Sequence, residues 1–158
     1  GENASSDISG LIGQYAHGNE PSHHTLYIYS MLGQPWKCAD KVREVLSTLY
    51  FDGEAGLSGN EDGGQMSAWY VMSALGFYQA EPASARYWFG SPIVKEATLK
   101  VKGGEMHIVA ENNSEQNRYI QRVWLNGEEY RQPWISHADL TAGGELRFEM
   151  GESPTLWY

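Results

Sequence analysis

The sequence predicts an α+β chain, with helices in its first part and a small antiparallel β unit in its second part. Two observations support this fold class. Apolar residues first recur at helical spacing, and later they alternate with polar residues as in half-buried strands. The pattern changes between Pro82 and Pro92, so we predict a helical domain over residues 1–90 and a β domain over residues 91–158. A chain of 158 residues can bury a core without disulfides.

Three helices are predicted in the first part. The first covers Pro21–Leu32, with proline in its first turn and Gly33 at its end. The second begins near Pro35, and the third runs from about Gly64 to Leu75, before Gly76. Their apolar faces are interpreted as core. These faces comprise Leu26, Tyr29 and Leu32 in the first helix, Val42, Val45, Leu46 and Leu49 in the second, and Met66, Trp69, Tyr70 and Leu75 in the third.

Alternating segments predict the strands of the second part. Residues 97–110 read as a hairpin that turns at Gly103-Gly104. Residues 119–125 lead into Asn126-Gly127, which is a strong signal for a type I′ turn. Residues 146–150 alternate again. The second part is therefore predicted to be a small antiparallel, sandwich-like β unit.

Composition excludes several classes of partner. The chain carries 20 acidic and 11 basic side chains, for a net charge of −9, and its Lys and Arg residues are not clustered. Nucleic acid is therefore not an expected partner. No apolar run approaches the roughly 18 to 20 residues of a membrane span, so we expect no membrane insertion. Cys38 is the one cysteine and is interpreted as a core thiol.

A repeated Gly-Asn-Glu loop precedes the first and the third predicted helices, at residues 18–20 and 59–61. If consecutive helices are antiparallel neighbours, the first and third are parallel, and both loops lie at the same end of the helical layer. Carboxylate and amide oxygens at helix N-termini suit a hard cation such as Ca²⁺. The residues that would converge there are Asn19, Glu20, Asn60 and Asp62.

Helix capping is the alternative for these carboxylates. Asp62 with Gln65 is a variant of the capping box, and Glu20 precedes a proline at an ordinary N-cap position. Spacing alone leaves capping and a cation site both open. His23 and His24 lie near the same loop, and because adjacent helical positions face different directions, they are not expected to bind one metal together. One of them is a candidate for a polar pocket.

The loop motifs, taken together, resemble the C-terminal part of glycoside hydrolase family 92. This is a family of calcium-dependent, inverting exo-α-mannosidases of mainly bacterial origin. The resemblance covers nearly the whole chain. The segments that carry it are residues 17–24, residues 59–70, Gly76-Phe77-Tyr78, residues 117–121, Leu125-Asn126-Gly127, residues 134–137, Asp139-Leu140 and Gly143-Gly144.

This resemblance implies a fold and a set of site residues. The helices would be the last ones of an (α/α)₆ catalytic barrel, followed by the closing β unit. Asn19 and Glu20 would be calcium ligands, and Asp62 would bind calcium and act as the general base on water. Asn60 stands where some members have a second acid, and His23 or His24 would contact sugar hydroxyls.

The expected function is that of the C-terminal part of an exo-α-mannosidase, which removes terminal α-linked mannose, with α-1,2 as the expected linkage, from glycans. The family's general acid lies upstream of residue 17, so the chain would need the N-terminal remainder of the enzyme and be inactive alone. The parent enzyme is expected to be exported. Two alternatives remain open: a non-catalytic calcium- or glycan-binding module, and another glycosidase built of six helical hairpins.

Overall fold

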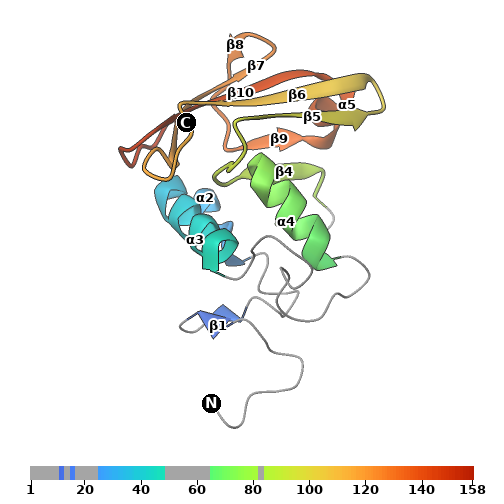
Figure 1. Cartoon of the computed structure of the whole chain (residues 1–158). Helices are drawn as coiled ribbons and strands as arrows, with labels where there is room; N and C mark the ends of the chain where they lie inside the picture. Colours follow the sequence, from blue (N-terminus) through green and yellow to red (C-terminus); the bar gives the residue numbers. More distant parts are fainter. Residues whose placement is uncertain (1–10, 13–14, 17–24, 49–64, 82–83) are drawn as a thin grey trace.

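The structure is a computed structural model in which helices lie against one side of a β region (Figure 1). It describes residues 11–12, 15–16, 25–48, 65–81 and 84–158. The strands β1 (Leu11–Ile12) and β2 (Tyr15–Ala16) form a small antiparallel pair. The mixture of helices and sheets confirms the predicted α+β class.

The second and third predicted helices are confirmed. Helix α3 spans Pro35–Thr48, and helix α4 spans Gln65–Leu75. The predicted stripe of α3 is buried at Val42, Val45 and Leu46, whereas Leu49 lies outside the described residues. An apolar stripe at spacings of three and four places these side chains on one face of a helix, which accounts for their burial together.

The first predicted helix is interrupted in its described part, where Thr25 is helical and Leu26 and Tyr27 form a turn. Helix α2 spans only Ile28–Met31, and the predicted residues 21–24 lie outside the described part of the chain. The chain reverses at Gly33, whose φ is +75°. The predicted buried face is also wrong at Leu32, which is 67% exposed, while Ser30 is buried at 1%. The Ser30 hydroxyl tolerates burial because it donates a hydrogen bond to the Phe89 carbonyl at 3.0 Å.

A five-stranded sheet forms most of the β region, in the order β5-β6-β10-β7-β8. Both predicted hairpins are confirmed, and Asn126 and Gly127 have the positive φ values of 52° and 83° that a type I′ turn requires. The strands are β5 (Glu96–Val101), β6 (Gly104–Glu111), β7 (Tyr119–Leu125), β8 (Glu128–Glu129) and β10 (Gly144–Gly151).

One strand pair departs from the predicted antiparallel arrangement. Strand β10 pairs with β7 in antiparallel fashion but with β6 in parallel fashion. Parallel pairing needs a long crossover, and residues 112–143, which include helix α5 (His137–Ala142), supply it. Because β10 is central, its apolar residues Leu146 and Phe148 are fully buried.

Strand β7 also departs from its expected alternation. The pattern predicts Tyr119, Gln121 and Val123 on one face, yet the buried residues are Ile120 and Val123. The register with β10 shifts between Glu149 and Met150. A bulge adds one residue to one strand, so side chains before it change face.

A second sheet has three strands, and the pattern did not predict it. It consists of β3 (Phe77–Tyr78), β4 (Arg86–Phe89) and β9 (Trp134–Ser136), in that order and antiparallel. Its strands come from both sides of the boundary expected near residue 90. The division into domains 1–90 and 91–158 stays a prediction.

Two buried clusters meet at this second sheet. The first joins the helices to Tyr78 and Trp88, and the second joins Phe77 and Phe89 to the five-stranded sheet. Neighbouring residues of β3 and β4 thus face opposite clusters, as the alternation of side chains along a strand requires. The three-stranded sheet therefore separates the helical layer from the five-stranded sheet.

Candidate functional site

The predicted site residues lie in two segments that the structure does not describe, residues 17–24 and 49–64, which contain the two predicted Gly-Asn-Glu loops. The parts of the chain that follow them are described from Thr25 and from Gln65 onward. The residues concerned are Asn19, Glu20, His23 and His24 in the first loop, and Asn60 and Asp62 in the second. Their roles stay predictions.

One buried cluster holds both segments that leave the loops. Leu26 and Tyr27 follow the first loop directly, Trp69 lies in the second turn of α4, and all three belong to the helical cluster. The Tyr27 hydroxyl and the Ser73 Oγ form a buried hydrogen bond of 2.7 Å. The Tyr78 ring contacts the rings of Tyr27 and Trp69, at centroid distances of 5.8 and 6.5 Å. The exits of the two loops are therefore fixed to the same rigid core.

The helices run in opposite directions at this core. Figure 1 shows α3 ending, and α4 beginning, at the lower end of the helical layer. Residues 25–27 and the start of α4 lead from the two candidate loops. The N-terminus of an 11-residue helix such as α4 carries a partial positive charge, which stabilises carboxylates placed before it. Asp62 precedes α4 by three residues.

His107, His137 and Cys38 contact neighbouring side chains or lie in the core. His137 stacks on Tyr87 at a centroid distance of 5.9 Å, and its Nδ1 lies 2.9 Å from the Tyr87 hydroxyl. His107 lies beside Thr98 on the exposed face of β6. Burial raises the pKa of the Cys38 thiol to about 12, so it stays protonated at neutral pH. The interpretation of Cys38 as a core thiol is confirmed.

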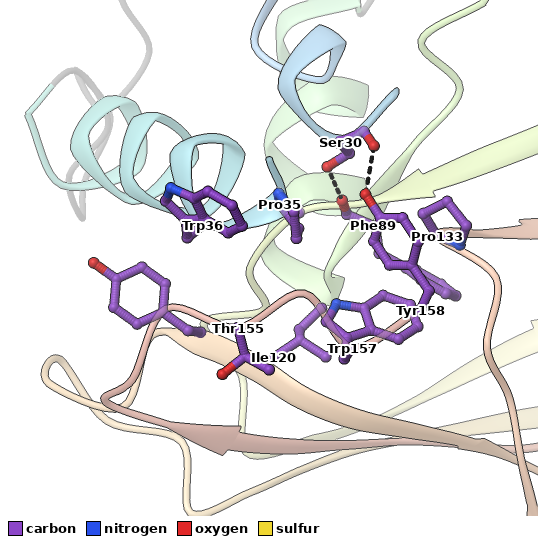
Figure 2. A pocket seen from close by; sticks show the side chains of 11 residues that line it. Ser30, Pro35, Trp36, Phe89, Ile120, Pro133, Thr155, Trp157 and Tyr158 are labelled. Carbon is purple, nitrogen blue, oxygen red and sulfur yellow. Dashed lines mark hydrogen bonds between the residues drawn. The ribbon is translucent and has the colours of Figure 1, made fainter. Parts of the chain in front are cut away.

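Among the hollows of the described residues, two lie beside the helical layer. A cavity of about 10 Å³ lies between Ser30, Phe89 and Tyr158 (Figure 2), far below the roughly 300 to 1,000 Å³ of small-molecule sites. A groove of about 410 Å³ beside α3 is lined by Asp40 and Arg118, among others. These two side chains approach to 3.8 Å, so their charges are directed to each other.

No metal-binding group is present among the described residues, since nowhere in that part of the chain do three His, Cys, Asp or Glu side chains converge. None of the described helices is long and apolar enough to span a membrane.

Sequence reasoning missed the buried serines that support the site. Ser30 and Ser73 are 1% and 0% exposed, and each forms a hydrogen bond to a distant segment. The available signal was spacing, because Ser73 lies four residues after Trp69 and shares its helix face. A small polar residue in an apolar stripe indicates a buried partner.

Comparison with known proteins gives one consistent family. The model of the glycosyl hydrolase family 92 catalytic domain matches residues 1–152. A family GH92 alpha-mannosidase of Bacteroides thetaiotaomicron, solved with mannoimidazole, superposes with a TM-score of 0.89 at 40% sequence identity. That match covers 95% of this chain and 20% of the solved chain.

Two further relatives agree with this match. A family GH92 inverting mannosidase of the same bacterium is 43% identical, with a TM-score of 0.82, and the match covers 91% of this chain and 20% of that one. An uncharacterized secreted glycosidase of Arthroderma benhamiae is 29% identical, and the match covers 89% of this chain and 19% of the relative. The chain thus spans about a fifth of its relatives' length, and its match to the family extends over almost all of its own residues. The chain belongs to glycosyl hydrolase family 92.

Proposed function

We propose that this chain is the C-terminal portion of an inverting, calcium-dependent exo-α-mannosidase. The parent enzyme would remove terminal α-linked mannose, with α-1,2 as the expected linkage, from mannose-containing glycans. The observation that carries this proposal is the family match over residues 1–152, together with 40% identity to an alpha-mannosidase solved with mannoimidazole. The secreted relative from Arthroderma benhamiae supports export of the parent.

The described helices would be the last ones of an (α/α)₆ barrel. The opposite directions of α3 and α4, and their shared buried cluster, support this part of the proposal. The predicted loops would then open at one rim of the barrel, where the N-terminal remainder of the enzyme would complete the site.

The donor set of the two loops fits calcium. Asn19, Glu20 and Asp62 offer only oxygen ligands, which hard cations prefer. When bound, calcium would supply a positive charge that holds two vicinal hydroxyls of the mannose ring. The ligands would come from both loops, whose exits share one buried cluster in the structure.

The chain's own residues would provide half of the acid–base pair. In an inverting glycosidase, a base removes a proton from water while an acid, roughly 6.5 to 9.5 Å away, protonates the leaving oxygen. Asp62 would be the base, Asn60 would orient the water or the ligands, and His23 or His24 would bind sugar hydroxyls. The acid would come from the N-terminal remainder.

Mannosidase kinetics of the full-length parent test the proposal. Asp62→Asn should lower kcat by roughly 10² to 10⁴, because the general base is lost. Asp139→Asn is the matched control, since Asp139 is exposed on α5 and should leave kcat unchanged. Equal activity of the two variants would refute the role of Asp62.

Calcium and the separate chain provide two further checks. Chelation should lower the Tm and the activity of the parent, and excess calcium should restore both.

The separate 158-residue chain should not release mannose from an aryl α-mannoside. Turnover by the separate chain would disprove the need for an acid from the remainder. Calcium-dependent binding of mannose oligosaccharides by a parent without turnover would favour a non-catalytic module.

A further inference from the structure

The last seven residues of the chain, 152–158, cross from the five-stranded sheet to the helical layer, and we call them the strap. The strap follows β10 and is held near its start by Gln121, whose Nε2 donates to the Ser153 carbonyl at 2.8 Å. The Thr155 hydroxyl donates to Oε1 of the same Gln121 at 3.1 Å. The match to the family model ends at residue 152, where the strap begins.

The far end of the strap packs against the buried cluster of the five-stranded sheet and reaches helix α2. The Trp157 ring contacts the Phe89 ring at a centroid distance of 6.0 Å and the Tyr158 ring at 4.8 Å. The Tyr158 hydroxyl donates to the Ser30 carbonyl at 2.6 Å, across 128 positions of sequence. Burial raises the pKa of Tyr158, so the phenol stays a donor at neutral pH.

Ser30, which lies in α2, forms hydrogen bonds both to the strap and to strand β4. Figure 2 shows its carbonyl accepting from Tyr158 while its hydroxyl donates to the Phe89 carbonyl. Helix α2 has four residues, and so short a helix is not stable by itself. Its position therefore depends on such tertiary contacts.

We propose that the strap positions α2, and that Tyr158 is the positioning residue. Helix α2 begins four residues after His24, the end of the loop predicted to bind calcium and mannose. A loosened α2 would weaken binding by that loop, whereas the predicted base lies on the other loop. This consequence for binding rests on the proposed function, but the contact between strap and helix does not.

The test compares Tyr158→Phe with Tyr130→Phe in the full-length parent. Tyr130 is a matched control, because its half-buried hydroxyl donates to the Trp134 carbonyl at 2.8 Å, within the β region. Both variants lose one phenol-to-carbonyl hydrogen bond. Hydrogen exchange over residues 26–34 should accelerate roughly two- to tenfold in Tyr158→Phe alone. Equal exchange in the two variants would overturn the proposal.

Kinetics then test the consequence for binding. Tyr158→Phe should raise the KM for an aryl α-mannoside and the calcium concentration for half-activation, each roughly two- to tenfold, with kcat kept within about twofold. Faster exchange with unchanged KM and calcium dependence would overturn the positioning role. Absence of calcium-dependent mannosidase activity in the wild-type parent would overturn the proposed function. Hydrogen exchange would still test whether the strap positions α2.

Discussion

Arg43 joins helix α3 to the β region, and replacing it gives a sharp test of that junction. Its guanidinium donates to Ser91 Oγ at 2.9 Å, to the Pro92 carbonyl at 2.8 Å, to the Ser114 carbonyl at 3.0 Å and to Asn113 Oδ1. Burial lowers the pKa of Arg43 to about 10, which still leaves it charged at pH 7. The substitution Arg43→Met keeps most of the apolar stem and removes all four hydrogen bonds.

The expected loss follows from these contacts. A net hydrogen bond contributes about 1 kcal/mol, so four would contribute about 4 kcal/mol if each were fully effective. The Pro92 carbonyl keeps one donor in the variant, since Asn113 Nδ2 also donates to it at 2.8 Å. Part of the guanidinium is solvated, which lowers the gain from each bond. We therefore expect Arg43→Met to reduce the free energy of unfolding by about 2 to 3 kcal/mol.

Urea unfolding of the chain, followed by tryptophan fluorescence, measures this loss. With a slope of about 2 kcal/mol per M, the midpoint should fall by about 1 to 1.5 M. Lys41→Met is the matched control on the same helix, because Lys41 is exposed and its pair with Glu44, at 3.4 Å, contributes little. A midpoint for Arg43→Met equal to that of Lys41→Met would refute the reasoning.

Three further predictions concern the core and the turns. Because the buried Cys38 thiol keeps its proton to about pH 12 while the unfolded thiol loses it above pH 9.0, the free energy of unfolding should fall across this window. Cys38→Ala should flatten that decline in pH-dependent denaturation, and an unchanged slope would contradict the assignment. Gly103→Ala should cost about 2 kcal/mol or more in urea unfolding, since a Cβ there collides with the Ala142 backbone. Gly127→Ala, in open space at φ +83°, should cost only about 1 kcal/mol, and the reverse order would count against this packing. Phe148→Ala should cost about 3 to 5 kcal/mol by calorimetry, because Phe148 is fully buried, and a loss under about 1 kcal/mol would show that the site is not packed.

Local signals in the sequence were sufficient for the hairpins and the longer helices. Asn126-Gly127 specifies its own turn, since both residues tolerate positive φ, and the stripe of α3 specifies its own buried face. Each of these features is decided within about ten residues. That is why pattern reading located them correctly.

Features set by distant segments were not predictable in this way. The alternation of β10 indicates a strand but does not say that β6 lies parallel beside it. The three-stranded sheet pairs β4 with β9, more than 40 positions later, through strands too short to show a pattern. Ser30 is buried because a carbonyl of β4 accepts its hydroxyl, which no local pattern reveals.

The candidate site was reached through motif resemblance, and its family is confirmed. The individual roles of Glu20, Asp62, His23 and His24 stay predictions, because those residues lie in the loops outside the described part of the chain. Spacing left capping and calcium binding both open for the carboxylates. In the described core, Tyr27 and Trp69 hold the segments that follow both loops in one buried cluster.

The central place of β10 has a consequence for the order in which the molecule is made. The ribosome produces this strand after all of its neighbours, yet it lies between β6 and β7. Until residue 151 has emerged, the two hairpins cannot join, and the apolar residues Met106 and Ile108 of β6 remain exposed. We expect a nascent chain stalled before Gly144 to bind chaperones or aggregate, and a chain stalled well beyond Tyr158 to resist proteolysis.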